Sequence, residues 1–95
     1  MNIYDVIVRP LETEKAYLQR EFGKYVFIVH LDANKRDVKH AVQEIYGVDV
    51  EKVHTMIMPG KFSRIRGRRA LTRRPPWKKA IVTLAPGERI EALEA

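Results

Sequence analysis

Alternating apolar and polar positions predict three β-strands. The clearest covers residues 24–31, where apolar side chains occupy both faces, which implies that both faces of this strand are covered. One face carries Tyr25, Phe27, Val29 and Leu31, and the other carries Val26 and Ile28. A second strand is expected over 48–58, with a bulge or bend near Lys52, where the apolar positions change phase. A third strand covers 79–85 and ends before Pro86.

Capping residues and a period of 3.6 residues predict two helices. The Thr-Glu pair at 13–14 combines a cap with an acid in the first turn, and this helix should run to about Arg20. The second helix starts at Asn34, with Asp37 in the place of the usual Glu or Gln of a capping box, and Gly47 closes it. Its apolar stripe consists of Val38, Ala41, Val42 and Ile45.

The order of these elements predicts an α+β fold. Strand, helix and strand form a right-handed crossover, and the last strand fills the gap antiparallel. The result is a split β-α-β unit, a ferredoxin-like variant with helices packed on an antiparallel sheet, beside which residues 1–9 form a short edge strand or one loose turn. The connection 60–76 is far longer than a usual hairpin turn. We therefore expect a long basic hairpin arm, about 60–77, that projects on the order of 25 Å from a single domain of residues 1–95.

Charge is distributed very unevenly along the chain. There are 18 basic and 12 acidic residues, which gives a formal net charge of +6. Between Lys52 and Gly87 there is no Asp or Glu, and ten of the basic residues lie there, so the other positions carry more acidic than basic residues. The segment 59–79 holds four large apolar residues, too few to offset its ordering entropy by burial. A polyanion is therefore expected to order the arm.

The arm is the main candidate site, and its chemistry is phosphate neutralisation. Arginine dominates it, and the guanidinium group binds phosphate bidentately and stacks on bases. The predicted RNA-binding residues are Lys61, Arg64, Arg66, Arg68, Arg69, Arg73, Arg74, Trp77, Lys78 and Lys79. Trp77 has two interpretations, since it either stacks on an unpaired base or holds the arm's base against the domain. A solvated charge run is disfavoured because such tails lie at a terminus and not between two strands.

Other site types have little support in the sequence. Tyr25 and Phe27 are similar to the aromatic pair of an RNA-recognition sheet, but a pair of core aromatics is favoured. His30, His40 and His54 lie on separate elements without ligand spacing, so neither a metal nor a cofactor is expected. No Ser/His/Asp set, paired-carboxylate cleft or phosphate-binding glycine loop can be assembled, so no enzyme is expected.

Composition also limits the compartment. The chain has no cysteine, which excludes disulfides, and the glycines and prolines of the arm argue against an amphipathic membrane anchor. Neither a signal peptide nor a membrane span is expected, so the sequence predicts a cytosolic-type chain, or an organellar one after processing. A stand-alone nucleic-acid or RNA-chaperone module and a protein–protein adaptor stay open as alternatives.

A series of short motifs extends over nearly the whole chain. They are Arg9-Pro10, Thr13-Glu14-Lys15-Ala16, Lys24-Tyr25, Ala41-Val42, Val53, Thr55, Gly60-Lys61, Arg73-Arg74, the run from Trp77 to Leu84, and the tail from Gly87 to Leu93. With these motifs the chain resembles bacterial-type ribosomal large-subunit protein twenty-three, and the Trp77–Leu84 run after a basic loop is the most specific of them. It departs from that family at His54, at Pro59 and at Pro75-Pro76, where the family commonly has Asn, no such proline, and a single acidic residue.

This resemblance implies a structural constituent of the large ribosomal subunit, cytoplasmic and bound to large-subunit ribosomal RNA at the rim of the polypeptide exit tunnel. It further implies contact with the neighbouring large-subunit protein twenty-nine and docking of trigger factor and signal recognition particle. The docking glutamate of the family's Ser/Thr-Glu-Lys motif corresponds to Glu14. A basic arm for RNA and a net-acidic body left free for proteins agree with these implications.

Overall fold

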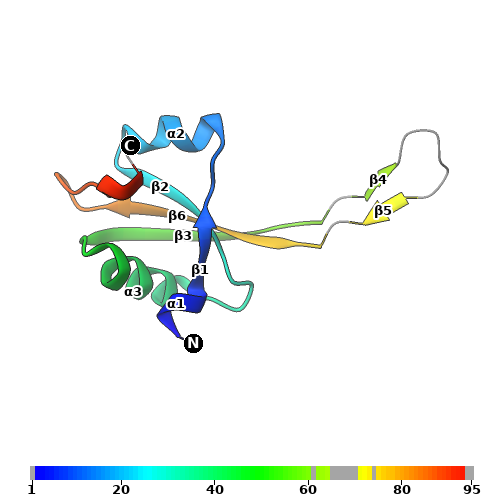
Figure 1. Cartoon of the computed structure of the whole chain (residues 1–95), viewed down its shortest axis with the longest axis horizontal. Coiled ribbons are helices and arrows are strands. Elements are labelled where there is room, and N and C mark those ends of the chain that lie inside the picture. Colours follow the sequence, from blue (N-terminus) through cyan, green and yellow to red (C-terminus); the bar gives the residue numbers. More distant parts are fainter. Residues whose placement is uncertain (1, 61, 65–70, 74, 94–95) are drawn as a thin grey trace.

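The computed structural model describes residues 2–60, 62–64, 71–73 and 75–93, and over 62–64 and 71–73 it describes the backbone alone. A head of one sheet and its helices carries a long two-stranded projection, and the molecule measures 51 × 29 × 19 Å (Figure 1). In chain order the elements are α1 (Ile3–Val6), β1 (Ile7–Pro10), α2 (Glu14–Arg20), β2 (Lys24–Val29), α3 (Lys35–Tyr46), β3 (Val50–Met58), β4 (Phe62–Arg64), β5 (Leu71–Arg73), β6 (Trp77–Leu84) and the 3-10 turn η1 (Glu91–Leu93).

Four strands form the sheet of the head in the order β1-β2-β6-β3. The crossover from β2 through α3 to β3 leaves a gap that β6 fills, antiparallel to both neighbours. This arrangement confirms the predicted split β-α-β fold. Before it, the chain forms one helical turn and then the edge strand β1, so both interpretations of the first nine residues apply in succession.

Capping residues mark the starts of α2 and α3 and the end of α3 where the sequence predicts them. Thr13 Oγ1 accepts a hydrogen bond from the N–H of Ala16 at the start of α2. At the start of α3 the reciprocal capping box is present, because Asn34 Oδ1 accepts from the N–H of Asp37 and Asp37 Oδ2 accepts from the N–H of Asn34. Gly47 ends α3 in the left-handed conformation, with φ of +64°.

The predicted irregularity in β3 is also present. Val50 pairs with Leu84 and Lys52 pairs with Thr83, so Glu51 is the extra residue of a bulge. The strand β2 is shorter than predicted and ends at Val29. The chain turns there toward the cap of α3, with the N–H of Ala33 bonded to the carbonyl of His30, which leaves Leu31 largely exposed.

The core lies between the sheet and α3. Tyr25, Phe27 and Val82 lie on this face of the sheet and are fully buried, which confirms that the two aromatics are core residues. The helix contributes Val38, Ala41 and Val42, as predicted. Ile45, also expected in this stripe, is 39% exposed. Tyr46 takes its place and stacks on Phe27, with 5.8 Å between the ring centroids.

The opposite face of the sheet is only partly covered, which corrects the expectation of cover on both sides. Figure 1 shows α2 and α3 on opposite sides of the strands. Val26 lies beneath α2, and it and Ala16 of that helix are both buried. The seven-residue α2 is too short to cover the whole strand, so Ile28 stays half-buried at the edge of a hollow.

Candidate nucleic-acid interface

The projection starts as a direct continuation of two strands of the head. β3 and β6 pair as far as Met58 opposite Trp77, and β4 and β5 then form a separate two-stranded antiparallel sheet. Between the two sheets stand Pro59-Gly60 on one leg and Pro75-Pro76 on the other. Proline lacks the N–H that a ladder requires, so these residues separate the two sheets.

Most of the predicted RNA-binding side chains lie outside what the structure describes. These are Lys61, Arg64, Arg66, Arg68, Arg69, Arg73 and Arg74. For two of them the backbone is given, with Arg64 of β4 opposite Leu71 and Arg73 of β5 opposite Phe62. Contact between the arm and RNA therefore stays a prediction at the level of individual residues.

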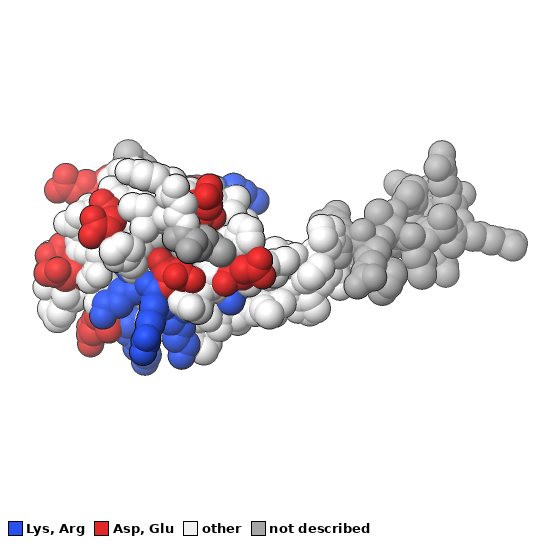
Figure 2. All heavy atoms as spheres, turned by 90° about the horizontal axis from the view of Figure 1, so that it is seen from below, with Lys and Arg blue, Asp and Glu red and all other residues white. Residues whose placement is uncertain are grey.

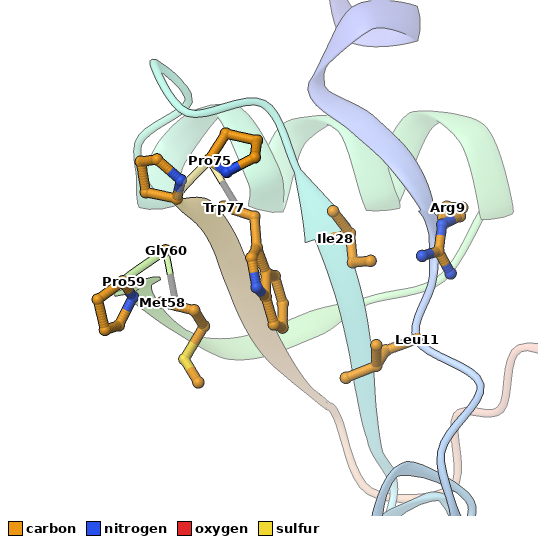
Figure 3. Close-up of a pocket in the computed structure, with 9 residues that line it drawn as sticks. Arg9, Leu11, Ile28, Met58, Pro59, Gly60, Pro75 and Trp77 are labelled. Carbon is orange, nitrogen blue, oxygen red and sulfur yellow. The ribbon is translucent and has the colours of Figure 1, made fainter. Parts of the chain in front are cut away.

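Trp77 lies at the junction of arm and head, in a hollow of about 740 Å³. Figure 3 shows its indole ring between Met58 on one side and Ile28 and Leu11 on the other. These side chains share the face of the sheet opposite α3, the open face. Met58 is opposite Trp77, and Ile28 is opposite Lys79, which follows Trp77 by two residues in β6. Trp77 is half-buried, so one part of it contacts the head and another part faces the hollow.

Lys78 and Lys79 point to opposite faces of the sheet, as successive strand residues do. Lys78 Nζ donates hydrogen bonds to the carbonyls of Ala33, at 2.5 Å, and Leu31, at 3.5 Å, so it ties the β2–α3 connection to β6. Lys79 lies on the open face and lines a second hollow, of about 370 Å³. The structure therefore gives the first lysine a structural contact, whereas the second is placed beside the Trp77 hollow.

Glu14 lines the same second hollow as Lys79, at the start of α2. Leu11 borders both hollows, so the predicted protein-docking residue and the predicted RNA-binding base of the arm are neighbours on one face. Glu14 is exposed, and so are Leu18 and Phe22 farther along, with exposed fractions of 55% and 78%.

The register-paired positions of the open face carry basic, polar and apolar residues and no carboxylate, and Glu51, the bulge residue of β3, lies outside these pairs. By register this face holds Lys24, Val26, Ile28, Lys52, His54, Met56, Met58, Trp77, Lys79, Ile81 and Thr83, with Arg9 at its edge. Among the described residues no ion pair neutralises Arg9 or Lys79. Figure 2 presents the side of the head that carries α3, opposite the open face, where acidic side chains are widely spread and several of the basic ones form one group.

A buried arginine organises the far end of α2. The Arg20 guanidinium lies 3.6 Å from the Glu12 carboxylate and 4.7 Å from the centre of the Tyr17 ring. Tyr17 donates a hydrogen bond to the same carboxylate, and this bond raises the pKa of the tyrosine above its ordinary value. These contacts fix the helix that presents Glu14.

Other candidate chemistry stays apart in the structure. His30 follows β2, His40 lies on α3 and His54 lies on β3. Within the described residues there is no group of three or more His, Cys, Asp or Glu side chains placed to hold a metal ion. Nor does any described helix combine the length and the apolar character required to span a bilayer.

The comparisons with known proteins point to one family. The family model described as ribosomal protein L23 matches residues 5–92. The chain belongs to the ribosomal protein L23 family. A large ribosomal subunit protein uL23 from Herpetosiphon aurantiacus is 50% identical over 96 residues, which cover 99% of this chain and 98% of the relative. Those from Roseiflexus castenholzii and Thermus thermophilus are 49% and 50% identical, over 99% and 96% of this chain and 98% and 93% of their own.

Family membership confirms the resemblance and sets the class of function. The L23 family comprises structural, non-enzymatic constituents of the large ribosomal subunit. The chain is therefore a ribosomal protein that associates with the ribosome and its RNA, and in bacteria the ribosome is cytoplasmic.

Proposed function

We propose that residues 1–95 act as one RNA-binding domain, which holds large-subunit ribosomal RNA through its arm near the polypeptide exit tunnel. The observation that carries this proposal is an acid-free stretch with ten basic residues, which in sequence includes the outer parts of β3 and β6, the two strands that extend out of the head, and the connection between them. Phosphate groups are the ligand that a cluster of arginine forks recognises best. The proposed contacts are the arm residues named from the sequence, with Trp77, Lys78 and Lys79 at its base.

The salt dependence of binding tests this proposal. If the arm neutralises about six phosphates, the log–log slope of affinity against salt should be roughly −4 to −5 through counterion release. The triple variant Arg64→Gln, Arg66→Gln, Arg68→Gln should make the slope shallower by roughly three. A matched control removes three exposed charges of α3, through Lys35→Gln, Arg36→Gln and Lys39→Gln. A slope near zero, or equal effects of the two triple variants, would reject the arm as the RNA-binding element.

The start of α2 supports a second proposal, that Glu14 docks trigger factor and signal recognition particle. Glu14 is exposed at the first turn, and Leu18 and Phe22 add exposed apolar surface nearby. A charged residue beside apolar side chains suits a protein partner. The family resemblance adds contact with large-subunit protein twenty-nine to the same proposal.

Ribosome binding by trigger factor tests this second function. Glu14→Ala should weaken binding of the factor to ribosomes while the protein itself stays on the large subunit. Glu44→Ala, an exposed glutamate on α3, is the matched control and should leave factor binding intact. Equal factor binding by the Glu14 variant and the wild type would exclude the glutamate from the docking site. Sedimentation of one copy with the large subunit separates both proposals from a stand-alone RNA module.

A further inference from the structure

We propose that the hollow beside Trp77 receives one unstacked base of ribosomal RNA, with the indole ring as the stacking surface and Arg9 on the adjoining phosphate. This inference rests on the proposed RNA-binding function and specifies one contact within it. The hollow lies at the junction of arm and head, where β3 and β6 leave the sheet. Its volume of about 740 Å³ falls within the roughly 300–1,000 Å³ typical of small-ligand sites.

The shape of the hollow is set by rigid parts of the chain. Trp77 and Met58 are held by their strand pairing, and Ile28 stands on the neighbouring strand β2. Prolines 59, 75 and 76 form part of the wall, and each has a fixed backbone φ. Such walls lose little conformational freedom when a planar group enters, so ordering them costs little.

The Trp77 ring is available for stacking. Among the described residues the stacked ring pair is Phe27 with Tyr46, and Trp77 stacks on no other ring. Met58 and Ile28 flank it with apolar groups, as Figure 3 shows. Trp77 is half-buried and lines the hollow, so part of its ring is exposed there. Aromatic side chains with exposed ring surface stack on the unpaired bases of RNA loops and bulges.

Charge favours RNA over an apolar peptide as the occupant. Arg9 lines the hollow, is exposed, and has no ion-pair partner among the described residues. Lys79 lies on the same face, two strands from Arg9 with Ile28 between them, and the register-paired positions of this face hold no carboxylate. An uncompensated guanidinium beside an aromatic surface matches a nucleotide, which presents a flat base joined to a negative phosphate.

The lining also predicts how selective the contact is. Among the described residues that line the hollow, Arg9 alone is charged, and the others are apolar residues, prolines, a glycine and the tryptophan. Few groups can therefore read the edge of a base, whereas every base has a face that stacks. We expect the hollow to accept any of the four bases with similar affinity.

Intrinsic fluorescence gives a direct test, because Trp77 is the only tryptophan of the chain. The full chain is titrated with an oligoadenylate single strand and, separately, with a fully paired RNA duplex of equal length. The single strand should quench Trp77 emission, while the duplex should bind through the arm without comparable quenching. Salt-dependent binding of both RNAs with unchanged emission would overturn the base site and leave the proposed function standing. Failure of both RNAs to bind would reject the proposed function itself.

Two substitutions of Trp77 separate stacking from packing. Trp77→Phe keeps a flat ring, and its affinity for the single strand should stay within a few-fold of the wild type. Trp77→Leu keeps apolar volume without a ring and should weaken binding by roughly 5- to 150-fold, the range expected for loss of one stacked base. Thermal unfolding of both variants checks that they fold, and the wild-type quenching test holds if one does not. Equal affinities of two folded variants, or quenching by an apolar decapeptide and not by RNA, would overturn the proposal.

Discussion

Arg20 Nη1 donates a 2.7 Å hydrogen bond to the main-chain carbonyl of Leu93, 73 residues along the chain. The contact is reciprocated, since Arg89 Nη1 donates a 2.7 Å bond to the carbonyl of Arg20. Ile90 lies between Arg89 and Leu93 in sequence, is buried in the core and donates its N–H to the Tyr25 hydroxyl. The C-terminal segment is thereby tied to the end of α2, the helix that presents Glu14.

This contact predicts a loss of stability when Arg20 is replaced by methionine, an apolar residue that is also unbranched. Arg20 is only 7% exposed, and Arg20→Met leaves the Leu93 carbonyl without its donor. We expect the free energy of unfolding to fall by about 1–3 kcal/mol, as measured by denaturant titration. Arg36→Met, on the exposed side of α3, should change it by less than about 0.5 kcal/mol. Equal stability of the two variants would show that the tail contact contributes nothing.

Much of the fold could be predicted because its signals are local. Strand alternation, the caps at Thr13 and Asn34 and the glycine at position 47 act within a few residues, and each lies where the sequence indicated. The errors concern contacts between distant segments. Leu31 was predicted to continue β2, but the chain turns to reach the cap of α3, and Ile45 yields its place in the core to Tyr46.

The open face of the sheet was missed for the same reason. Tyr25 and Phe27 drew attention as aromatic strand residues, yet they face α3 and are fully buried. The other face of the same strand carries Val26, which lies beneath α2, and Ile28. Ile28 meets Trp77 and Met58 only through the pairing of three strands far apart in sequence. Alternation along one strand gives two faces, but it does not tell which face a short helix such as α2 leaves uncovered.

Replacement of Gly47 should lower the free energy of unfolding although there is room for a side chain. Its φ is +64°, in the left-handed region, and a Cβ built there meets no atom within 4 Å. The cost of Gly47→Ala is therefore a backbone cost of about 1–2 kcal/mol, to be measured by thermal or denaturant unfolding. Gly47→Asn should cost less, because asparagine tolerates this conformation better. If alanine and asparagine were equally harmful, a cause other than backbone conformation would be required.

The half-buried phenol of Tyr46 predicts a loss of stability in alkali. Burial raises the pKa of Tyr46 above the ordinary 10.0, so the folded chain keeps this proton longer than the unfolded chain. Stability from this group is complete below the unfolded pKa and is lost as pH rises from there through the folded pKa. Unfolding measured at about pH 9 and about pH 11 should show a smaller loss for Tyr46→Phe than for the wild type. An equal loss in both proteins would assign the alkaline transition to other groups.

Substitution of Lys78 should lower stability, whereas substitution of Lys79 should weaken RNA binding. Lys78 Nζ is bonded to the carbonyls of Ala33 and Leu31, so Lys78→Met should lower the free energy of unfolding by about 1–3 kcal/mol. Lys79 has no such bond among the described residues and faces the open side of the sheet, so Lys79→Met should change stability by less than about 0.5 kcal/mol. Its effect should instead make the log–log salt slope of RNA binding shallower by roughly one. Denaturant unfolding and RNA binding on the same two variants measure both effects. A Lys78 variant as stable as the wild type, or a Lys79 variant with the wild-type salt slope, would contradict the two different roles that the opposite orientations of these lysines on β6 imply.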